Sequence, residues 1–288
     1  MRFLAFCLLS FAPCLLPLRA AAQTGWKVTS SEALPAPAEG VAHHLLTLER
    51  PHEGGTNADN DPANEATLHF VSFEAGAYTF RLFDQNPHDN ASLADTMAEN
   101  HCVAGTNGGY FSPEFDPVGL LVCDGRTVRP EGRSRLLSGV LAVTAAHHIS
   151  LRRVNESAAS SLPGKHARQA VQCGPFLVED RRPVAGLNAA RAARRTAVFT
   201  DGGGRWGLAV CTPVTLEEFA AILADPALTP GGLKIARALN LDGGGSTALW
   251  VRPAPGGKSG EPVSLPERGY VRDFVGIVPR PRVAVAKP

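Results

Sequence analysis

Three segments of the chain combine polar side chains with small residues, each directly after an apolar stretch. They are Gly105-Thr106-Asn107-Gly108-Gly109-Tyr110-Phe111, then Gln172-Cys173-Gly174-Pro175 with Arg191, Arg194 and Arg195 downstream, and finally Asn240-Leu241-Asp242-Gly243-Gly244-Gly245-Ser246-Thr247. Guanidinium and carboxylate groups on neighbouring loops suit the binding and cleavage of a charged substrate. Loops on a rigid scaffold carry most functional groups, so we expect the function of the chain at these segments.

The three glycines after Asp242 remove every side chain where the backbone turns. Their N–H groups can therefore approach a bound anion, with the Asp242 carboxylate beside them. An ordinary tight turn is the alternative, because Asp201-Gly202-Gly203-Gly204 repeats the pattern between two expected strands. Composition by itself favours the turn.

Several common active-site motifs are missing around these loops. No Gly-Lys-Ser/Thr directly follows the three glycines, and no Gly-x-Gly-x-x-Gly opens a helix after a strand, which argues against a nucleotide site. Ser246 lacks the closing glycine of a nucleophile elbow, and no His-Glu-x-x-His occurs. Because there is no Cys-x-x-Cys pair either, we expect neither a metal site nor another cofactor.

Residues 1–22 have the pattern of a secretory signal peptide. Arg2 precedes an apolar run, and Ala20-Ala21-Ala22 forms a small-residue cleavage site. A lipid anchor at Cys14 is the alternative, and Pro13 disfavours it. We expect a secreted or periplasmic protein that has no membrane span after removal of the leader.

Four cysteines remain after the leader, in a compartment that permits disulfides. They flank the loop segments, and the preferred pairing is Cys102 with Cys123 and Cys173 with Cys211. The alternative is that all four are small buried apolar residues.

The charge balance excludes one class of partner. The chain has 28 Lys and Arg against 27 Asp and Glu, without a run of five like charges, so we expect no nucleic acid. The sequence leaves the oligomeric state open.

Short strands dominate the expected elements, and the fold class is α+β: a mixed, mainly antiparallel sheet with few helices. Residues 23–66 are interpreted as an N-terminal extension and polar loop, and residues 67–288 as a single catalytic domain. Expected helices begin after Ser92, at the Thr215 capping box and near residue 231. The expected strands are 41–48, 67–73 and 77–83 as a hairpin, 120–123, 139–144, 170–178, 196–200 and 206–211 as a hairpin, 238–241, 247–252 and 274–278.

Several blocks, in this order and spacing, resemble the phosphodiester glycosidase family over residues 67–280. They are Asn107-Gly108-Gly109-Tyr110-Phe111 with Pro117 and Gly119, Gln172-Cys173-Gly174-Pro175, Arg195-Thr196-Ala197-Val198, Leu239-Asn240-Leu241-Asp242-Gly243-Gly244-Gly245-Ser246 and Glu267-Arg268. The resemblance implies a hydrolase that cleaves the sugar C1–O bond of a sugar-1-phosphodiester resembling the N-acetylglucosamine-1-phosphodiester. It also implies a carbohydrate substrate in surface or extracellular polysaccharide, since bacterial relatives are linked to exopolysaccharide.

The resemblance also assigns roles. Asp242 is expected as the carboxylate that faces the oxocarbenium-like carbon, either as nucleophile or as base for water. Arg195, with Arg268 second, is expected to clamp the phosphate, and the N–H groups of Gly243, Gly244 and Gly245 complete the anion pocket. Asn107 and Gln172 would orient sugar hydroxyls or the phosphate, and Tyr110 and Ser246 would contact the substrate. The leaving phosphomonoester has a second pKa of about 6, so a strong general acid is dispensable.

Two other functions stay open at this stage. One is a non-catalytic glycan-binding or exopolysaccharide assembly protein that keeps the fold. The other is a metal-dependent phosphodiesterase that cleaves P–O with Asp242 and either Asp116 or Asp201.

Overall fold

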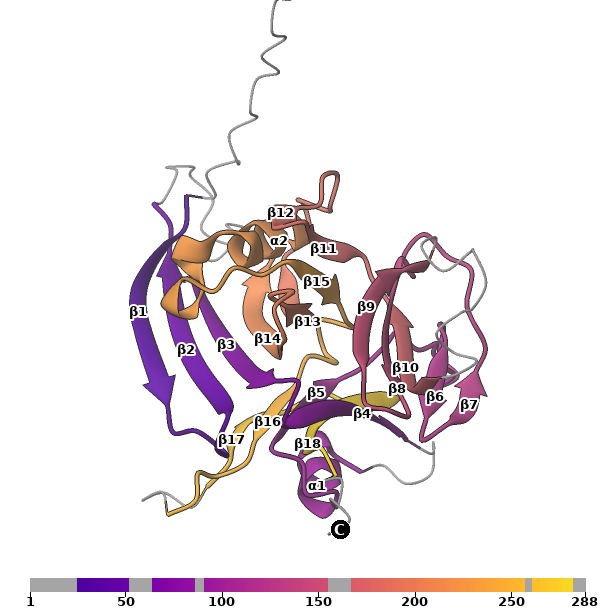
Figure 1. Ribbon diagram of the computed structural model, residues 1–288. Coiled ribbons are helices and arrows are strands. Elements are labelled where there is room, and N and C mark those ends of the chain that lie inside the picture. The colour runs from indigo at the N-terminus through magenta and orange to yellow at the C-terminus, as the bar shows by residue number, and fades with distance from the viewer. Residues whose placement is uncertain (1–24, 52–63, 86–90, 155–166, 257–260, 282–288) are drawn as a thin grey trace, which may run out of the picture.

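The computed structural model describes residues 25–51, 64–85, 91–154, 167–256 and 261–281. The expected leader, residues 1–22, and most of the polar loop before residue 66 lie outside the described residues. Within them, three antiparallel sheets and two α-helices make up the fold (Figure 1), which confirms the α+β class.

The largest sheet has eight strands. In spatial order they are β1 (Lys27–Leu34), β2 (Val41–Glu49), β3 (Glu65–Glu74), β14 (Arg205–Val214), β13 (Ala193–Thr200), β15 (Arg237–Asn240), β11 (Phe176–Glu179) and β12 (Arg182–Pro183). The expected domain boundary at residue 67 falls inside β3, and β1 and β2 extend the same sheet.

Two five-stranded sheets complete the fold. One has the order β7 (Arg126–Arg129), β6 (Leu121–Cys123), β10 (Ala167–Cys173), β8 (Gly139–Thr144) and β9 (Ile149–Arg153). The other has the order β17 (Val263–Leu265), β16 (Leu249–Val251), β5 (Ala104–Asn107), β18 (Asp273–Pro279) and β4 (Tyr78–Asp84).

The eight-stranded sheet is apolar on both faces, because side chains alternate along each strand. On β3, Val71 and Phe73 belong to a core cluster that also contains residues of both smaller sheets. Phe70 faces the other way, into a cluster with Phe219 of α2 (Leu216–Ala224), and Figure 1 shows α2 over this sheet. The large sheet is therefore the central layer, with α2 on one side and the smaller sheets on the other.

Two of the three expected helix starts are present. Ser92 caps α1 (Leu93–Glu99), and Thr215 and Glu218 form the capping box of α2. The helix expected near residue 231 is wrong: the chain forms two short 3₁₀ turns there, Pro226–Leu228 and Pro230–Gly232. Gly231 and Gly232 have positive φ values, which a continuing α-helix does not accommodate.

Two strand expectations also need correction. The turn at residues 74–76 exists, but β3 and β4 do not form a hairpin, since β3 pairs with β2 and β14 while β4 pairs with β18. The strand expected over 170–178 is two strands in different sheets, β10 and β11, separated by Gly174 and Pro175. The hairpin of β13 and β14 forms as expected.

The expected disulfides are wrong, because all four cysteines of the described chain are free and buried. Cys102 packs in the cluster beside α1, Cys211 packs in the cluster beneath α2, and Cys123 and Cys173 lie in the cluster between the sheets. Burial raises the pKa of each thiol. They act as small apolar core residues, the alternative that the sequence left open.

Candidate active site

The loop at Asp242–Ser246 leaves the end of β15 and is fastened to three other segments by its main chain. The Asp242 N–H donates to Gly108 O at 3.0 Å, and the Gly244 N–H donates to Arg194 O at 2.8 Å. The Arg268 N–H donates to Gly245 O at 2.7 Å. Gly244 has φ +64°, a conformation that favours glycine. The loop that the sequence singled out is therefore the meeting point of segments that are distant along the chain.

Asp242 lies half-buried at the start of this loop. One of its own carboxylate oxygens, Oδ1, accepts the N–H of Gly243 at 2.8 Å. Burial raises the pKa of Asp242 above its ordinary value, and hydrogen bonds from the Ser246 side chain and the Gly243 N–H oppose that shift. The carboxylate thus has fixed local donors and retains partial access to solvent.

Asn107, at the end of β5, is fully buried, with 0% of its surface exposed. Its Nδ2 donates to Asp242 O at 2.7 Å, and its Oδ1 accepts from Thr196 Oγ1 at 2.8 Å and from Ala248 N at 3.2 Å. The expected contact with substrate is therefore corrected to a positioning contact. Asn107 fixes the main chain from which the Asp242 side chain projects.

Gln172 is buried as well, with 1% of its surface exposed. Its Oε1 accepts from Leu120 N and Gly132 N, both at 2.9 Å, and its Nε2 donates to the carbonyls of Gly132 and Leu137. The expected substrate contact is replaced by a bridge between two loops. The structure does not bring this amide to the Asp242 loop.

Tyr110 stands close to the site but directs its hydroxyl to the scaffold. The hydroxyl donates to Gly174 O and accepts from Asn240 Nδ2 at 3.0 Å. Burial raises the pKa of Tyr110, and the charges of Cys173 and Asp242 raise it further. Tyr110 is therefore a neutral phenol that ties the loop after β5 to the end of β15.

Asp273 is a residue of this region that the sequence analysis missed. It begins β18, is fully buried, and its Oδ1 accepts the N–H of Gly109 at 2.9 Å. Burial, as the largest cause, raises the pKa of Asp273 to about 7. The N–H of Gly108 donates to Asp273 O and the carbonyl of Gly108 accepts the N–H of Asp242, so Gly108 links the two aspartates through main-chain hydrogen bonds. No sequence signal separated it from a strand-end turn residue.

Three arginines surround the glycine loop. The Arg195 guanidinium is buried, donates to the carbonyls of Val214 and Arg191, and has its Nη1 3.9 Å from the position of a Cβ atom at Gly243. Arg268 is exposed beside Gly245. Arg194, which the sequence analysis named in the second segment without giving it a role, donates to Pro266 O at 3.1 Å.

These arginines are not neutralised locally. Within the described ranges, Arg194, Arg195 and Arg268 have no ion pair with a carboxylate. Burial lowers the pKa of Arg194, and nearby Arg268 lowers it further, while Glu267 raises it. Burial also lowers the pKa of Arg195. The positive field is thus available to an anion at the loop. The alternation of side chains along a strand could have predicted that Arg194 and Arg195, which are neighbours on β13, point to opposite faces of the sheet.

A hollow of about 690 Å³ opens beside the loop, and we name it the Arg194 hollow. It reaches the loop at Gly244 and Gly245, whereas Asp242 is not part of its lining. Its lining residues are Thr67, His69, Ala193, Arg194, Val210, Cys211, Thr212, Pro213, Gly244, Gly245, Leu265, Pro266, Glu267 and Arg268.

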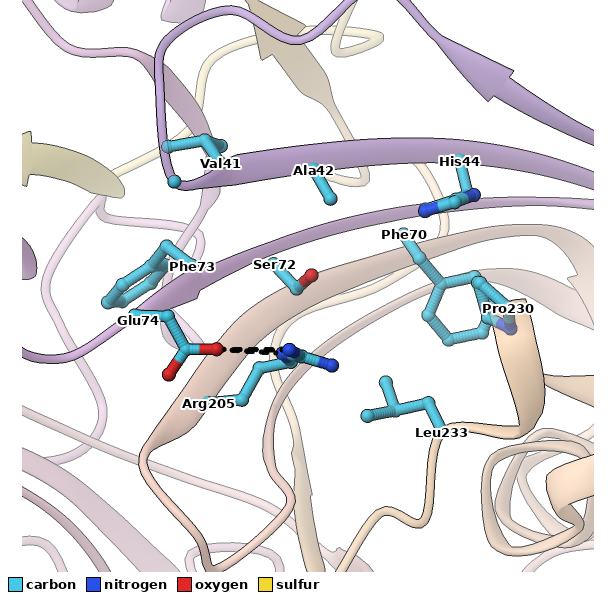
Figure 2. Close-up of a pocket in the computed structure, with 11 residues that line it drawn as sticks. Val41, Ala42, His44, Phe70, Ser72, Phe73, Glu74, Arg205, Pro230 and Leu233 are labelled. Atoms are coloured by element: carbon cyan, nitrogen blue, oxygen red, sulfur yellow. Dashed lines mark hydrogen bonds and ion pairs between the residues drawn. The ribbon is translucent and has the colours of Figure 1, made fainter.

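A smaller hollow of about 340 Å³ lies over the face of the large sheet that carries Phe70 and Ser72 (Figure 2). Its charged groups, Glu74 and Arg205, already pair with each other at 3.0 Å. It contains none of the expected site residues, so we do not assign the candidate site there.

Of the two alternative carboxylates, Asp201 has a structural task, whereas Asp116 is exposed and is hydrogen-bonded to Ser112 through its main chain. Asp201 Oδ1 accepts the N–H groups of Gly203 and Arg205 and so caps the turn between β13 and β14. Across the described part of the chain, no three His, Cys, Asp or Glu side chains gather as a metal cluster would require.

None of the described helices is long and apolar enough to cross a membrane.

Comparison with known proteins places this geometry in a family. A model of the phosphodiester glycosidase family matches residues 100–278, more than half of the chain. The catalytic domain of zebrafish N-acetylglucosamine-1-phosphodiester alpha-N-acetylglucosaminidase, auto-inhibited by its pro-peptide, is similar with a TM-score of 0.57 and 16% identity. That match covers 87% of this chain and 88% of the zebrafish chain.

A second solved structure, a protein from Burkholderia pseudomallei described as exported, has a TM-score of 0.59 and 13% identity. That match covers 94% of this chain and 100% of the Burkholderia chain. At these identities the likeness to solved structures shows the fold alone, and none of the curated proteins matches the chain. The family match extends over all three loop segments and over the strands β5, β13, β15 and β18 that carry them. By that match the chain belongs to the phosphodiester glycosidase family.

Proposed function

We propose that the chain is an exported hydrolase that cleaves the sugar C1–O bond of a sugar-1-phosphodiester in surface or extracellular polysaccharide. The observation that carries the proposal is the loop at Asp242–Ser246, around which one carboxylate and three arginines lie. Among the described residues, none of these arginines forms an ion pair with a carboxylate. Family membership supports the reaction class. The leader-like residues 1–22 support export.

The phosphate binds, in this proposal, to the positive field over Gly243–Gly245. Arg268 is exposed and free to reach an oxygen, whereas the buried Arg195 acts through its charge from beneath Gly243. Arginine suits this task because its planar fork matches the oxygen geometry of a phosphate.

The same field assists departure of the leaving group. As the C1–O bond breaks, its electron pair stays on the phosphate oxygen, and the arginines stabilise the added charge. The phosphomonoester formed is a weak base, with a second pKa of about 6, so departure needs little protonation.

Asp242 supplies the carboxylate that faces the carbon. It acts either as a nucleophile that forms a glycosyl ester or as a base that takes a proton from the attacking water. In both routes the water oxygen ends on C1 and the products are a free sugar and a phosphomonoester. Asn107 and the Gly243 N–H support the carboxylate by fixing its main chain and one of its oxygens.

The test is hydrolysis of N-acetylglucosamine-1-phosphate methyl ester in 18O-labelled water, followed by mass spectrometry of both products. The proposal expects the label on the sugar. Label on the phosphate would overturn C–O cleavage and leave a phosphodiesterase that cleaves P–O.

A further inference from the structure

The lining of the Arg194 hollow contains both charged and apolar side chains. Val210 of β14 and Leu265 of β17, with Pro213 and Pro266, supply apolar surface. Arg194 and Arg268 stand where the hollow meets Gly244 and Gly245. The hollow is therefore continuous with the loop to which the proposed function assigns the phosphate.

Apart from Arg194 and Arg268, no residue in the lining of this hollow is a cation at neutral pH. His69 lines it, and its Nδ1 lies 3.0 Å from His43 Nε2. Burial lowers the pKa of His69 to about 4 and is the largest cause that lowers the pKa of His43 to about 3. His43 is buried as well, with 1% of its surface exposed.

The two rings favour one arrangement of protons. His43 Nδ1 is buried without a hydrogen-bond partner among the described residues. A buried acceptor without a donor is tolerated better than a buried N–H without an acceptor. His43 Nε2–H therefore donates to His69 Nδ1, and His69 keeps its proton on Nε2. The His69 imidazole is therefore neutral, and its Nε2–H can donate a hydrogen bond in the hollow without adding a charge.

Glu267 is the carboxylate among the lining residues of the Arg194 hollow. Its Oε1 accepts the N–H of Leu93 at 2.9 Å, at the start of α1, where a negative charge is stabilised. Its charge raises the pKa of Arg194, although it forms no ion pair with Arg194 or with another residue that the structure describes. The lining thus retains the positive charge of Arg194 and Arg268 beside its apolar side chains.

We infer that the Arg194 hollow is the aglycone subsite and that it takes an apolar chain esterified to the phosphate of the sugar-1-phosphodiester. The inference rests on the C1–O cleavage of the proposed function and puts an apolar chain in place of a polysaccharide as the aglycone. Arg194 and Arg268 would hold the phosphate at the glycine loop, while the chain lies against Val210 and Leu265. A volume of about 690 Å³ is in the range of pockets that hold small organic groups.

The experiment compares methyl, butyl and octyl esters of N-acetylglucosamine-1-phosphate. Full burial of each methylene improves binding about fourfold, so we expect kcat/KM to rise at least about tenfold from the methyl to the octyl ester. Leu265→Ser should reduce that ratio several-fold. Leu233→Ser, in the smaller hollow of Figure 2, is the matched control and should leave the ratio unchanged.

Two results would overturn the inference and leave the proposed function intact. One is hydrolysis of the methyl ester with an octyl-to-methyl ratio near one, and the other is an equal loss of that ratio in both variants. If no ester is hydrolysed, the proposed function fails, and calorimetry decides the inference. Octyl phosphate must then bind at least about tenfold more tightly than methyl phosphate, with the preference lost in Leu265→Ser alone.

Discussion

Substitution of Gly243 by alanine perturbs the candidate site through one defined contact. A Cβ atom at Gly243 would lie 2.9 Å from Arg194 O, about half an ångström inside ordinary van der Waals contact. That carbonyl is main chain and already accepts the Gly244 N–H at 2.8 Å, so it cannot rotate away as a side chain would. The loop must therefore shift, and the hydrogen bond from Gly243 N to Asp242 Oδ1 shifts with it.

The expected cost has two parts. Overpacking of this kind lowers the free energy of unfolding by about 1–3 kcal/mol. A displacement of the carboxylate approaching 1 Å lowers kcat by about a hundredfold. Chemical denaturation followed by fluorescence measures the first, and initial rates on the methyl ester of N-acetylglucosamine-1-phosphate measure the second.

Gly76→Ala is the matched control for Gly243→Ala. Gly76 lies in the turn between β3 and β4, its φ is not positive, and no heavy atom lies within 4 Å of an added Cβ. Its unfolding free energy should change by less than about 0.5 kcal/mol, with kcat unaltered. The reasoning is refuted if Gly243→Ala retains wild-type kcat, or if the two variants lose activity equally.

Three further predictions concern buried groups. Asp273→Asn keeps an acceptor for the Gly109 N–H and removes a carboxyl whose pKa is raised to about 7 in the folded protein. Between about pH 4 and 7 the folded wild type keeps the carboxyl proton and the unfolded chain loses it, so the free energy of unfolding of the wild type falls as pH rises. Relative to wild type, the variant should therefore gain up to about 4 kcal/mol in free energy of unfolding from pH 4 to pH 8. A stability difference that does not change over this range, measured by urea denaturation, would contradict it. Because the four cysteines are free, a reductant should leave the Tm unchanged, and a fall of several degrees in calorimetry would indicate disulfides. Gln172→Leu should cost at least about 2 kcal/mol, since the N–H groups of Leu120 and Gly132 lose their acceptor; a neutral result in urea would show that water replaces it.

Local signals in the sequence predicted local structure well. The Thr215 capping box gave the helix, and the Asp201 turn gave the β13–β14 hairpin, because each signal involves atoms a few residues apart. The turn after Glu74 shows where this reasoning ends. It predicted a turn correctly but not that the chain passes from one sheet to another, which depends on strands far away in sequence.

The candidate site divides in the same way. The glycine loop and its arginines were found from spacing and resemblance, since small residues beside Asp242 carry a local signature. The burial of Asn107 and Gln172 depends on Thr196, Ala248, Leu120 and Gly132, which only the folded chain brings together. An amide that contacts substrate and one that holds a loop look alike in sequence.

The central claim is that the Asp242 carboxylate takes part in glycosidic cleavage, and its most direct test compares two Asp-Gly-Gly-Gly loops of the same chain. Asp242→Asn keeps the oxygen that accepts the Gly243 N–H, and Asp201→Asn keeps the oxygen that accepts the Gly203 N–H. With N-acetylglucosamine-1-phosphate methyl ester as substrate, kcat should fall by at least about a hundredfold in Asp242→Asn and stay near wild type in Asp201→Asn. Retention of kcat within a few-fold by Asp242→Asn would contradict the claim.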